Sequence, residues 1–300
     1  NLMTSSPNNA NPLVSVIINC FNGEKYLKSC IDSVINQTYK NWEIIFWDNL
    51  STDDSKKIIH KYSDKRIKYF CTEKFSKLYQ ARNLAIEKAS GTLIAFLDVD
   101  DFWFKDKLDK QIQKIKEENT NIVYSNFFTF YENSNKKKIF SKKILPKGQI
   151  TQKLFNNYRV GILTLLIKKD LLINRKFKNE YDVIGDFDLI TDISRKFEFT
   201  SIQEPLAIYR IHKDNVSLER IKKEKEELDS WITNNKSKYK SYSLDGVYEQ
   251  IKFLSVKIDL ISGNKVNAIK KILILKNILR KIKFLISCFL PNKILKILIS

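Results

Sequence analysis

The chain has 300 residues, of which 43% are hydrophobic and 12% aromatic, and 53 Lys and Arg against 34 Asp and Glu leave a formal net charge of +19. The apolar content excludes a disordered chain, and only 7 Gly and 5 Pro exclude collagen-like and propeller-type compositions. The four cysteines stand far apart, which argues against a disulfide framework or a zinc site and for a reducing compartment. Residues 1–12 are polar, and we expect a disordered tail rather than a secretion signal.

The first hundred residues alternate between strand-like and helix-like runs, a pattern that favours βαβ units and a mostly parallel sheet. We predict strands over 13–18, 42–47, 67–70 and 93–97. The helices predicted between them cover 24–36, a stretch after Asp53 that ends at Tyr62, and 80–89. Gly91 then suits a left-handed helix C-cap.

The next hundred residues continue the α/β pattern less regularly. We predict a helix over 105–117, strands over 122–131 and 162–167, and a charged loop or hairpin tip over 133–143. The alternation ends near Leu218, where a charged helical pattern begins. We therefore expect an α/β domain over 13–217, with helices on both faces of its sheet, and a basic, all-helical region over 218–300.

The C-terminal segment from Lys265 onward carries nine cations and no acid. If the segment is one helix, most of its cations lie on one side, although Lys271 falls among the apolar residues. The apolar residues that share the other side are Leu275, Ile278, Leu279, Ile282, Leu285 and Ile286. The pattern favours a helix lying on an anionic membrane surface, while packing against the main domain and nucleic-acid binding are alternatives. No apolar run approaches the ~18 residues of a membrane span. We expect a cytoplasmic protein on the cytosolic face of the inner membrane, without a nucleic-acid partner.

Acidic residues follow two of the predicted strands at the point where each strand ends. Asp48 follows the second strand, and Asp98, Asp100 and Asp101 follow the fourth. In an open α/β sheet, ligands bind outside the carboxyl ends of the strands, and clustered carboxylates there suit Mg²⁺ or Mn²⁺. Ordinary helix caps are the alternative for these acids and for Asp53.

Several catalytic motifs are missing from the sequence. It contains no G-x-S-x-G, no P-loop and no G-x-G-x-x-G, which counts against hydrolase, kinase and Rossmann dehydrogenase activities. His60 and His212 are the only histidines, so the chain has few histidine side chains that could bind a metal ion.

Six blocks of the sequence, in order, resemble those of the inverting family 2 glycosyltransferases, which have the GT-A fold. They are VSVIINCFNGEKYL (14–27), IIFWDNLSTD (44–53), ARNLAIEKASG (81–91), IAFLDVDD (94–101), IGDFDL (184–189) and YRIHKDNVS (209–217). The resemblance covers about residues 13–217. It implies inverting transfer of a hexosyl or N-acetylhexosaminyl group from a nucleotide-diphosphate sugar.

The resemblance also implies roles for individual residues. The nucleotide would be bound by Asn19, Phe21, Asp48, Asn49, Arg82 and Asp98. Asp100, with Asp98, would bind the Mn²⁺ or Mg²⁺ that grips the diphosphate, as in the family's D-x-D motif. Asp186 would be the general base that deprotonates the acceptor hydroxyl, with a plain helix cap as the alternative, and Asp188 would cap or support the same helix. His212 and Asp101 would lie on the acceptor and diphosphate side.

The sequence departs from the family pattern at four positions. Asn19 replaces the usual proline or threonine, and Asn49 replaces the second of two common aspartates, so we favour UDP while dTDP and GDP stay open. Leu50 replaces a common glycine, which suggests a differently shaped turn. Gly185 replaces the acidic residue that often precedes the base.

Taken together, these features predict an enzyme that adds a sugar to a glycan or lipid-linked acceptor in bacterial surface-polysaccharide or lipooligosaccharide synthesis. Its partners would be the nucleotide-sugar donor, that acceptor and the inner-leaflet surface, and the C-terminal helices could also pair between chains. The alternatives are a nucleotidyltransferase, or a non-catalytic protein that binds sugar or nucleic acid on the same fold.

Overall fold

The computed structural model describes residues 11–212 and 217–288. Most of the predicted tail, residues 1–10, and the last 12 residues of the basic segment lie outside the described residues. Asn11 and Pro12 are fixed through their backbone carbonyls, which accept hydrogen bonds from the side chains of Asn41 and Tyr39.

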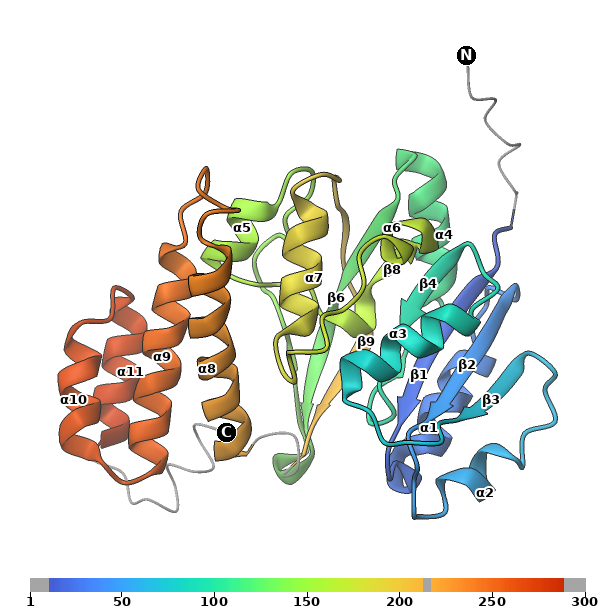
Figure 1. Cartoon of the computed structure of the whole chain (residues 1–300), viewed down its shortest axis with the longest axis horizontal. Coiled ribbons are helices and arrows are strands. Elements are labelled where there is room, and N and C mark those ends of the chain that lie inside the picture. Colours follow the sequence, from blue (N-terminus) through green and yellow to red (C-terminus); the bar gives the residue numbers. More distant parts are fainter. Residues whose placement is uncertain (1–10, 213–216, 289–300) are drawn as a thin grey trace.

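The N-terminal half of the sheet is parallel, in the order β3-β2-β1-β4 (Figure 1). Its strands are β1 (Val14–Cys20), β2 (Trp42–Asp48), β3 (Ile67–Cys71) and β4 (Leu93–Phe96). The connecting helices are α1 (Glu24–Ile35), α2 (Ser55–Ile59) and α3 (Leu78–Lys88). The burial of every residue of β1, β2 and β4 explains their continuous apolar runs, which are typical of parallel strands covered on both faces.

The other half of the sheet is mixed, so the expectation of a mostly parallel sheet holds only for the first half. It contains β5 (Phe102–Trp103), β6 (Ile122–Tyr131), β7 (Lys136–Ile139), β8 (Leu166–Lys168) and β9 (Thr200–Ile211). Strand β8 is antiparallel to both β4 and β6, whereas β6 and β9 are parallel. The charged 133–143 segment is a hairpin: the short turn η1 (Glu132–Ser134) connects β6 to β7, and so short a connection requires antiparallel strands.

The other helices before the end of β9 are α4 (Lys107–Glu118) and α7 (Gly185–Ser194), with 12 and 10 residues, and several shorter ones. Helix α4 precedes β6, and α5 (Thr151–Asn156), η2 (Ile162–Thr164) and α6 (Lys169–Ile173) surround β8. Only the last part of the predicted strand 162–167 is extended, because its first residues form η2. Helix α7 then leads to β9.

Gly91 is not the left-handed C-cap that its position suggested. Helix α3 ends at Ala89 with extended backbone, and Gly91 is absent from the residues with positive φ. A Cβ on Gly91 would lie 2.6 Å from the carbonyl oxygen of Leu13 and 2.7 Å from the hydroxyl oxygen of Ser15. Glycine is therefore required here by the close approach of β1.

Substituting Gly91 with alanine should destabilise the protein by about 1–3 kcal/mol, the usual cost of overpacking. The strand must move because the blocking atoms include backbone. Urea denaturation measures the change, with exposed Thr92→Ala as the neighbouring control. A Gly91→Ala variant as stable as that control would show that β1 moves without cost.

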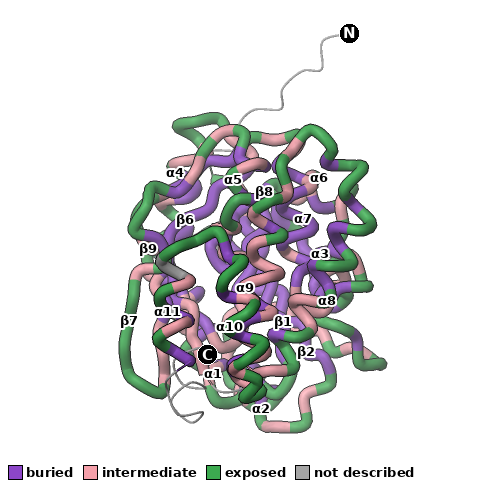
Figure 2. Tube along the Cα trace, turned by 90° about the vertical axis from the view of Figure 1, so that its left-hand side faces the viewer, coloured by how far each residue is buried: buried purple, intermediate pink, exposed green. Residues whose placement is uncertain are grey.

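Two apolar clusters cover the two faces of the sheet. One contains side chains of α1, α2 and α4, and the other contains side chains of α3, α5 and α7. Figure 2 shows the buried trace running through the strands while much of the outer helical surface is exposed.

Within the described residues, four helices follow β9 and lie side by side at one end of the molecule (Figure 1). They are α8 (Leu218–Asn235), α9 (Asp245–Ile261), α10 (Lys265–Leu273) and α11 (Ile278–Cys288). Helix α8 begins at Leu218, where the sequence pattern changes, yet Leu228 and Trp231 belong to the same apolar cluster as α5 and α7. The sheet domain and the first two C-terminal helices thus share a core.

The basic C-terminal segment is not one continuous helix, because residues 274–277 separate α10 from α11. A small cluster packs both helices against α9, and it includes Leu260, Ile272 and Phe284. Lys271, which intruded on the predicted apolar face, pairs with Asp259 of α9 at 2.6 Å. Within the described part of the chain, no helix has both the length and the apolar character needed to cross a membrane.

Candidate active site

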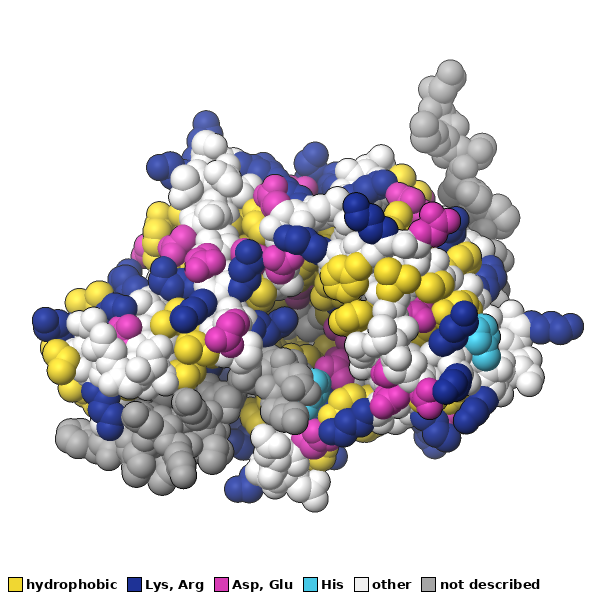
Figure 3. All heavy atoms as spheres, turned by 60° about the horizontal axis from the view of Figure 1, so that its bottom comes forward, with side chains coloured by type: hydrophobic (Ala, Val, Ile, Leu, Met, Phe, Trp, Pro, Cys, Tyr) yellow, Lys and Arg dark blue, Asp and Glu magenta, His cyan; other side chains and the backbone are white. Residues whose placement is uncertain are grey.

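The carboxyl ends of β1, β2 and β4 bring the predicted nucleotide and metal residues to one edge of the sheet. Cys20 at the end of β1 is in register with Asp48 at the end of β2, and β4 ends two residues before Asp98. Figure 3 shows acidic side chains and a histidine meeting near the centre of this face, whereas cations are scattered over it.

At this edge, Asn19 has an unpartnered side-chain donor among the described residues and Phe21 has an exposed ring. The side-chain nitrogen of Asn19 is buried and finds no hydrogen-bond partner among the described residues. Buried donors in native proteins are nearly always paired, so this amide is suited to a ligand acceptor. Phe21 is 51% exposed and meets the equally exposed Phe75 edge to face at 5.1 Å. Phe75 was not among the residues predicted for this site.

Asp48 and Asn49 are buried and already hydrogen-bonded within the protein. The two Asp48 oxygens accept from the Ser51 amide and the Tyr69 hydroxyl, each at 2.8 Å. The side-chain nitrogen of Asn49 donates to the backbone carbonyl of Ser76 at 2.7 Å, and its side-chain oxygen accepts from the backbone N–H of Ser76 at 3.1 Å. Both residues therefore shape the loop edge, and their contact with a nucleobase stays a prediction.

Leu50 has a φ of 66°, in the left-handed region. That is the conformation glycine adopts without strain, so the turn has the backbone expected of a glycine turn rather than the different shape we predicted.

Arg82 is buried beneath the site and forms an ion pair with the partly exposed Asp98. One terminal nitrogen of the guanidinium lies 2.7 and 3.0 Å from the two Asp98 oxygens. The guanidinium is 3% exposed and lies over the rings of Tyr79, Phe96 and Phe177. Its position is thus fixed by packing as well as by charge.

Asp100 and Asp101 extend the acidic cluster next to Asp98. Asp100 accepts from or donates to the His212 ring nitrogen at 3.0 Å, and burial, then the charge of Asp98, raises its pKa. Asp101 accepts the Arg210 amide at 2.8 Å through one oxygen, while its other buried oxygen has no partner among the described residues. Burial and the two neighbouring aspartates raise the pKa of Asp101 well above its usual range.

The chemistry of this cluster fits a divalent cation. Asp98 raises the pKa of Asp100, so the cluster carries negative charge that its protein partners do not fully offset, and carboxylate oxygens are preferred ligands of Mg²⁺ and Mn²⁺. Among the residues that the structure describes, no three His, Cys, Asp or Glu side chains form a complete metal site. A bound ion would need further ligands such as donor phosphate oxygens and water, as is common for Mg²⁺.

Asp186 lies in the first turn of α7, as predicted from its block. One of its oxygens accepts the Phe187 amide at 2.9 Å and is 3.3 Å from the Tyr79 hydroxyl, which also donates to the carbonyl of Val183 at 2.8 Å. Burial raises the pKa of Asp186, and the charge of Arg82 offsets only part of that rise. A raised pKa suits a general base, since it increases the driving force for accepting a proton.

Tyr79 also explains the unusual glycine before the predicted base. A Cβ on Gly185 would lie 2.5 Å from two ring carbons of Tyr79, so no larger residue fits. In this chain the tyrosine ring occupies the space beside Asp186.

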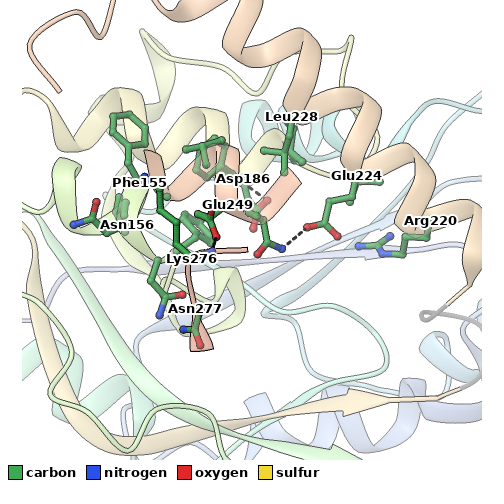
Figure 4. A pocket seen from close by; sticks show the side chains of 18 of the residues that line it. Phe155, Asn156, Asp186, Arg220, Glu224, Leu228, Glu249, Lys276 and Asn277 are labelled. Atoms are coloured by element: carbon green, nitrogen blue, oxygen red, sulfur yellow. Dashed lines mark hydrogen bonds between the residues drawn. The ribbon is translucent and has the colours of Figure 1, made fainter. Parts of the chain in front are cut away.

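A cavity of about 780 Å³ lies next to Asp186. It is lined from one side by the sheet domain, including Phe155, Tyr158 and Phe187, and from the other by the C-terminal helices, including Arg220, Glu224 and Gln250. Figure 4 shows Arg220 and Glu224 extending from α8 toward the end of the cavity where Asp186 lies.

Glu227 of α8 is a buried residue that the sequence analysis missed. Its carboxylate accepts the backbone amides of Asp182, Val183 and Ile184 at 2.7, 2.9 and 3.1 Å. These amides belong to the loop that leads into the helix bearing Asp186. In the sequence, Glu227 is one of several acids in a charged helix, and such a pattern is typical of a solvent-exposed face.

The family model described as Glycosyl transferase family 2 matches residues 15–186, more than half of the chain. The chain belongs to glycosyltransferase family 2. The matched segment begins in β1 and ends at Asp186, so it includes both the strand-end carboxylates and the predicted base. Membership of this family selects the glycosyltransferase interpretation over the two alternatives.

Relatives of this glycosyltransferase include two bacterial enzymes. The chain is 38% identical over 160 residues to the UDP-Glc:alpha-D-GlcNAc-diphosphoundecaprenol beta-1,3-glucosyltransferase WfgD of Escherichia coli, a match that spans 53% of this chain and 62% of that protein. It is 31% identical over 214 residues to the putative teichuronic acid biosynthesis glycosyltransferase TuaG of Bacillus subtilis, over 70% of this chain and 83% of that protein.

Solved structures confirm the predicted α/β GT-A fold. The S. aureus TarS 1–349 crystal structure in complex with UDP-GlcNAc matches with a TM-score of 0.57 at 16% identity, over 82% of this chain and 72% of that one. The mannosyltransferase PcManGT from Pyrobaculum calidifontis, in complex with GDP-Man and Mn2+, matches with a TM-score of 0.61 at 13% identity, over 96% and 84%. At these identities the likeness concerns the fold.

Proposed function

We propose that this glycosyltransferase transfers a sugar from a UDP-sugar, with inversion, to a hydroxyl of a glycan or lipid-linked acceptor in bacterial surface-polysaccharide synthesis. One observation carries the proposal: Arg82 pairs with Asp98 at 2.7 Å and lies over the ring of Tyr79, whose hydroxyl is 3.3 Å from Asp186. Two carboxylate groups 88 positions apart in sequence therefore belong to one site. Inverting displacement needs such an arrangement, with a base on one side of the sugar and a stabilised leaving group on the other.

Each side of the site has its own task in this proposal. Asn19 offers its unpartnered amide nitrogen to the nucleobase, and Phe21 and Phe75 flank it with apolar rings. Asp186 accepts the proton of the acceptor hydroxyl. The WfgD relative supports UDP as the nucleotide and a diphosphate-lipid acceptor, because the name of that enzyme specifies both.

Asp98 and Asp100 would hold a Mn²⁺ or Mg²⁺ ion in this proposal. When bound, the ion offsets the negative charge of the departing diphosphate. His212 keeps the Asp100 carboxylate oriented through the contact at 3.0 Å, and Asp101 fixes the neighbouring strand through the amide of Arg210.

Thermal stabilisation by UDP, dTDP, GDP and CMP, each with and without Mn²⁺, tests the donor side. We expect UDP with Mn²⁺ to raise the melting temperature, since a ligand at 100 times its Kd adds about 2.7 kcal/mol. Asp100→Asn should lose the Mn²⁺-dependent part, whereas Asp170→Asn, an exposed aspartate on α6, should keep it. A shift with GDP instead would replace UDP as the donor nucleotide, and no shift with any of them would contradict the proposal.

We further propose that the exposed apolar side chains of α10 and α11 contact the cytosolic surface of an anionic membrane. Each of the following is at least 39% exposed: Val266, Ile269, Leu273, Ile274, Ile278, Ile282 and Ile286. Lysines on the same two helices supply positive charge, each worth about 1 kcal/mol near an anionic leaflet. Membrane contact would place the enzyme where lipid-linked acceptors are found.

Replacing Ile278, Ile282 and Ile286 together with glutamine should reduce binding to vesicles of phosphatidylglycerol and phosphatidylethanolamine at least tenfold. The fold should survive because these side chains are already exposed. A double variant of exposed Ile144 and Ile173 provides the control for lost apolar surface elsewhere. Unchanged vesicle sedimentation would contradict membrane contact, and a concentration-dependent change in mass without vesicles would indicate pairing between chains instead.

A further inference from the structure

The cavity beside Asp186 is built jointly by the sheet domain and the C-terminal helices. Its far wall consists of side chains from α8 and α9, including Glu224, Leu228 and Gln250 (Figure 4). The family match ends at Asp186, so this wall lies outside the segment that defines the family. With about 780 Å³, the cavity has the size of ordinary small-molecule sites, which measure about 300–1,000 Å³.

The wall is fixed in place by tight contacts with α5. A Cβ on Gly246, at the start of α9, would lie 2.2 Å from the carbonyl oxygen of Phe155 and 2.5 Å from the Cα atom of Asn156. Next to it, Gln152 and Ser243 exchange two hydrogen bonds of 2.9 Å each. The cavity is therefore preorganised rather than a gap between two loosely associated parts.

The polar groups in the cavity are of the kind that bind sugar hydroxyls. Gln250 donates to Glu224 at 3.3 Å, a long bond that leaves donors and acceptors of both side chains available. The Arg220 side chain makes no hydrogen bond or ion pair with any residue in the described ranges, although its charge acts on Asp186 and Glu224. The buried hydroxyl of Tyr158 also has no partner there.

The apolar part of the lining combines aromatic and aliphatic side chains. Tyr158, Phe187 and Tyr209 are among the aromatic residues, whereas the ring of Phe155, which also lines the cavity, packs against Trp231 and Tyr239. Aromatic faces combined with a few convergent polar groups suit a pyranose ring, whose C–H face is apolar and whose edge carries hydroxyls.

We propose that this cavity binds the terminal sugar of the acceptor, and that Glu224 and Gln250 on the C-terminal helices select it by hydrogen bonds to its hydroxyls. The acceptor hydroxyl is thereby brought to the carboxylate of Asp186, which lines the same cavity. This inference rests on the proposed function and assigns the acceptor side of that site to the region after Leu218. The C-terminal helices are thus part of the active site.

Saturation-transfer NMR on the full chain with UDP and the diamagnetic ion Mg²⁺ tests the inference. The probes are the methyl glycosides of glucose, galactose, N-acetylglucosamine and rhamnose. We expect saturation transfer to at least one glycoside, reduced at least fivefold in Glu224→Ala and in Gln250→Ala. Glu226→Ala, an exposed glutamate on the same helix that does not line the cavity, should behave as the unchanged chain.

The UDP-dependent thermal shift, measured on the same samples, separates the two levels of the argument. A normal UDP shift with no glycoside signal, or with a signal equal in all variants, would overturn the acceptor site while leaving the proposed function intact. Loss of the UDP shift in the unchanged chain would overturn the proposed function itself. Melting temperatures of the two alanine variants verify that each one folds.

Discussion

Replacing Asp186 with asparagine is expected to reduce the rate of sugar transfer by about 10²–10⁴-fold, the usual contribution of a general base. Asparagine has the same shape and keeps an oxygen for the Phe187 amide, now accepted at 2.9 Å. It lacks the basic carboxylate that takes the acceptor proton. The fold should be retained, because burial already disfavours the charged form of Asp186.

Nucleotide binding provides the matched measurement for this variant. The UDP-dependent thermal shift should persist in Asp186→Asn, because the nucleotide is bound by other residues in our proposal. Exposed Asp170→Asn should transfer sugar at the unchanged rate. An Asp186→Asn enzyme with nearly full activity would exclude this carboxylate as the base and leave it as a helix-terminal residue.

The pH dependence of the unchanged enzyme follows from the same carboxylate. Because burial raises the pKa of Asp186, its basic form is lost at a pH above that of an ordinary aspartate as the solution is acidified. The transfer rate at saturating substrates should therefore fall with decreasing pH through that raised pKa and level off above it. An acid limb no higher than that of an exposed aspartate would contradict the assignment.

Replacing Glu227 with alanine is expected to lower the free energy of unfolding by about 3 kcal/mol, since hydrogen bonds to charged groups contribute about 1.5–3 kcal/mol each and are not additive. The variant leaves three backbone amides of residues 182–184 without their acceptor. The loop before Asp186 should then shift, and a displacement of about 1 Å is enough to reduce the rate roughly 10²-fold. Urea denaturation and steady-state transfer measure the two effects.

A positioning role for Glu227 predicts a particular pattern of kinetic change. The turnover number should fall much more than the KM for the nucleotide sugar changes, because this loop leads into the helix of the proposed base and contains none of the proposed nucleotide-binding residues. Glu227→Gln should restore part of the rate, since its single oxygen still accepts from the loop amides. Equal losses in Glu226→Ala, whose side chain is exposed, would show that the effect belongs to α8 as a whole.

The local pattern of the sequence determined the N-terminal half of the molecule. Each predicted strand from 13–18 to 93–97 overlaps the observed strand, because parallel strands buried on both faces produce continuous apolar runs. The carboxylates at strand ends and the block around Asp186 could also be identified from the sequence, because the order and spacing of their residues lie within short segments. Membership of glycosyltransferase family 2 and the GT-A fold followed from those blocks and are confirmed.

Only the tertiary structure decided how distant segments complete the site. Asp188 was expected to cap or support α7, and its true partners are the indole nitrogen of Trp231 at 2.8 Å and Lys178 at 3.1 Å. Likewise, nothing local to Gly185 indicates the Tyr79 ring that excludes a side chain there. Such contacts join residues that lie ten or more positions apart in the sequence. Periodicity shows which face of an element is buried, but it does not show which other element packs against that face.

The C-terminal region shows the same limit most clearly. Its charge and helical period were evident, and they suggested a separate extension after Leu218. The structure places Trp231 in the main core, Glu227 on the loop of the proposed base, and Glu224 in the cavity beside it. In the sequence all three belong to a charged helix, and only packing against α5 and α7 distinguishes them from exposed neighbours such as Glu226.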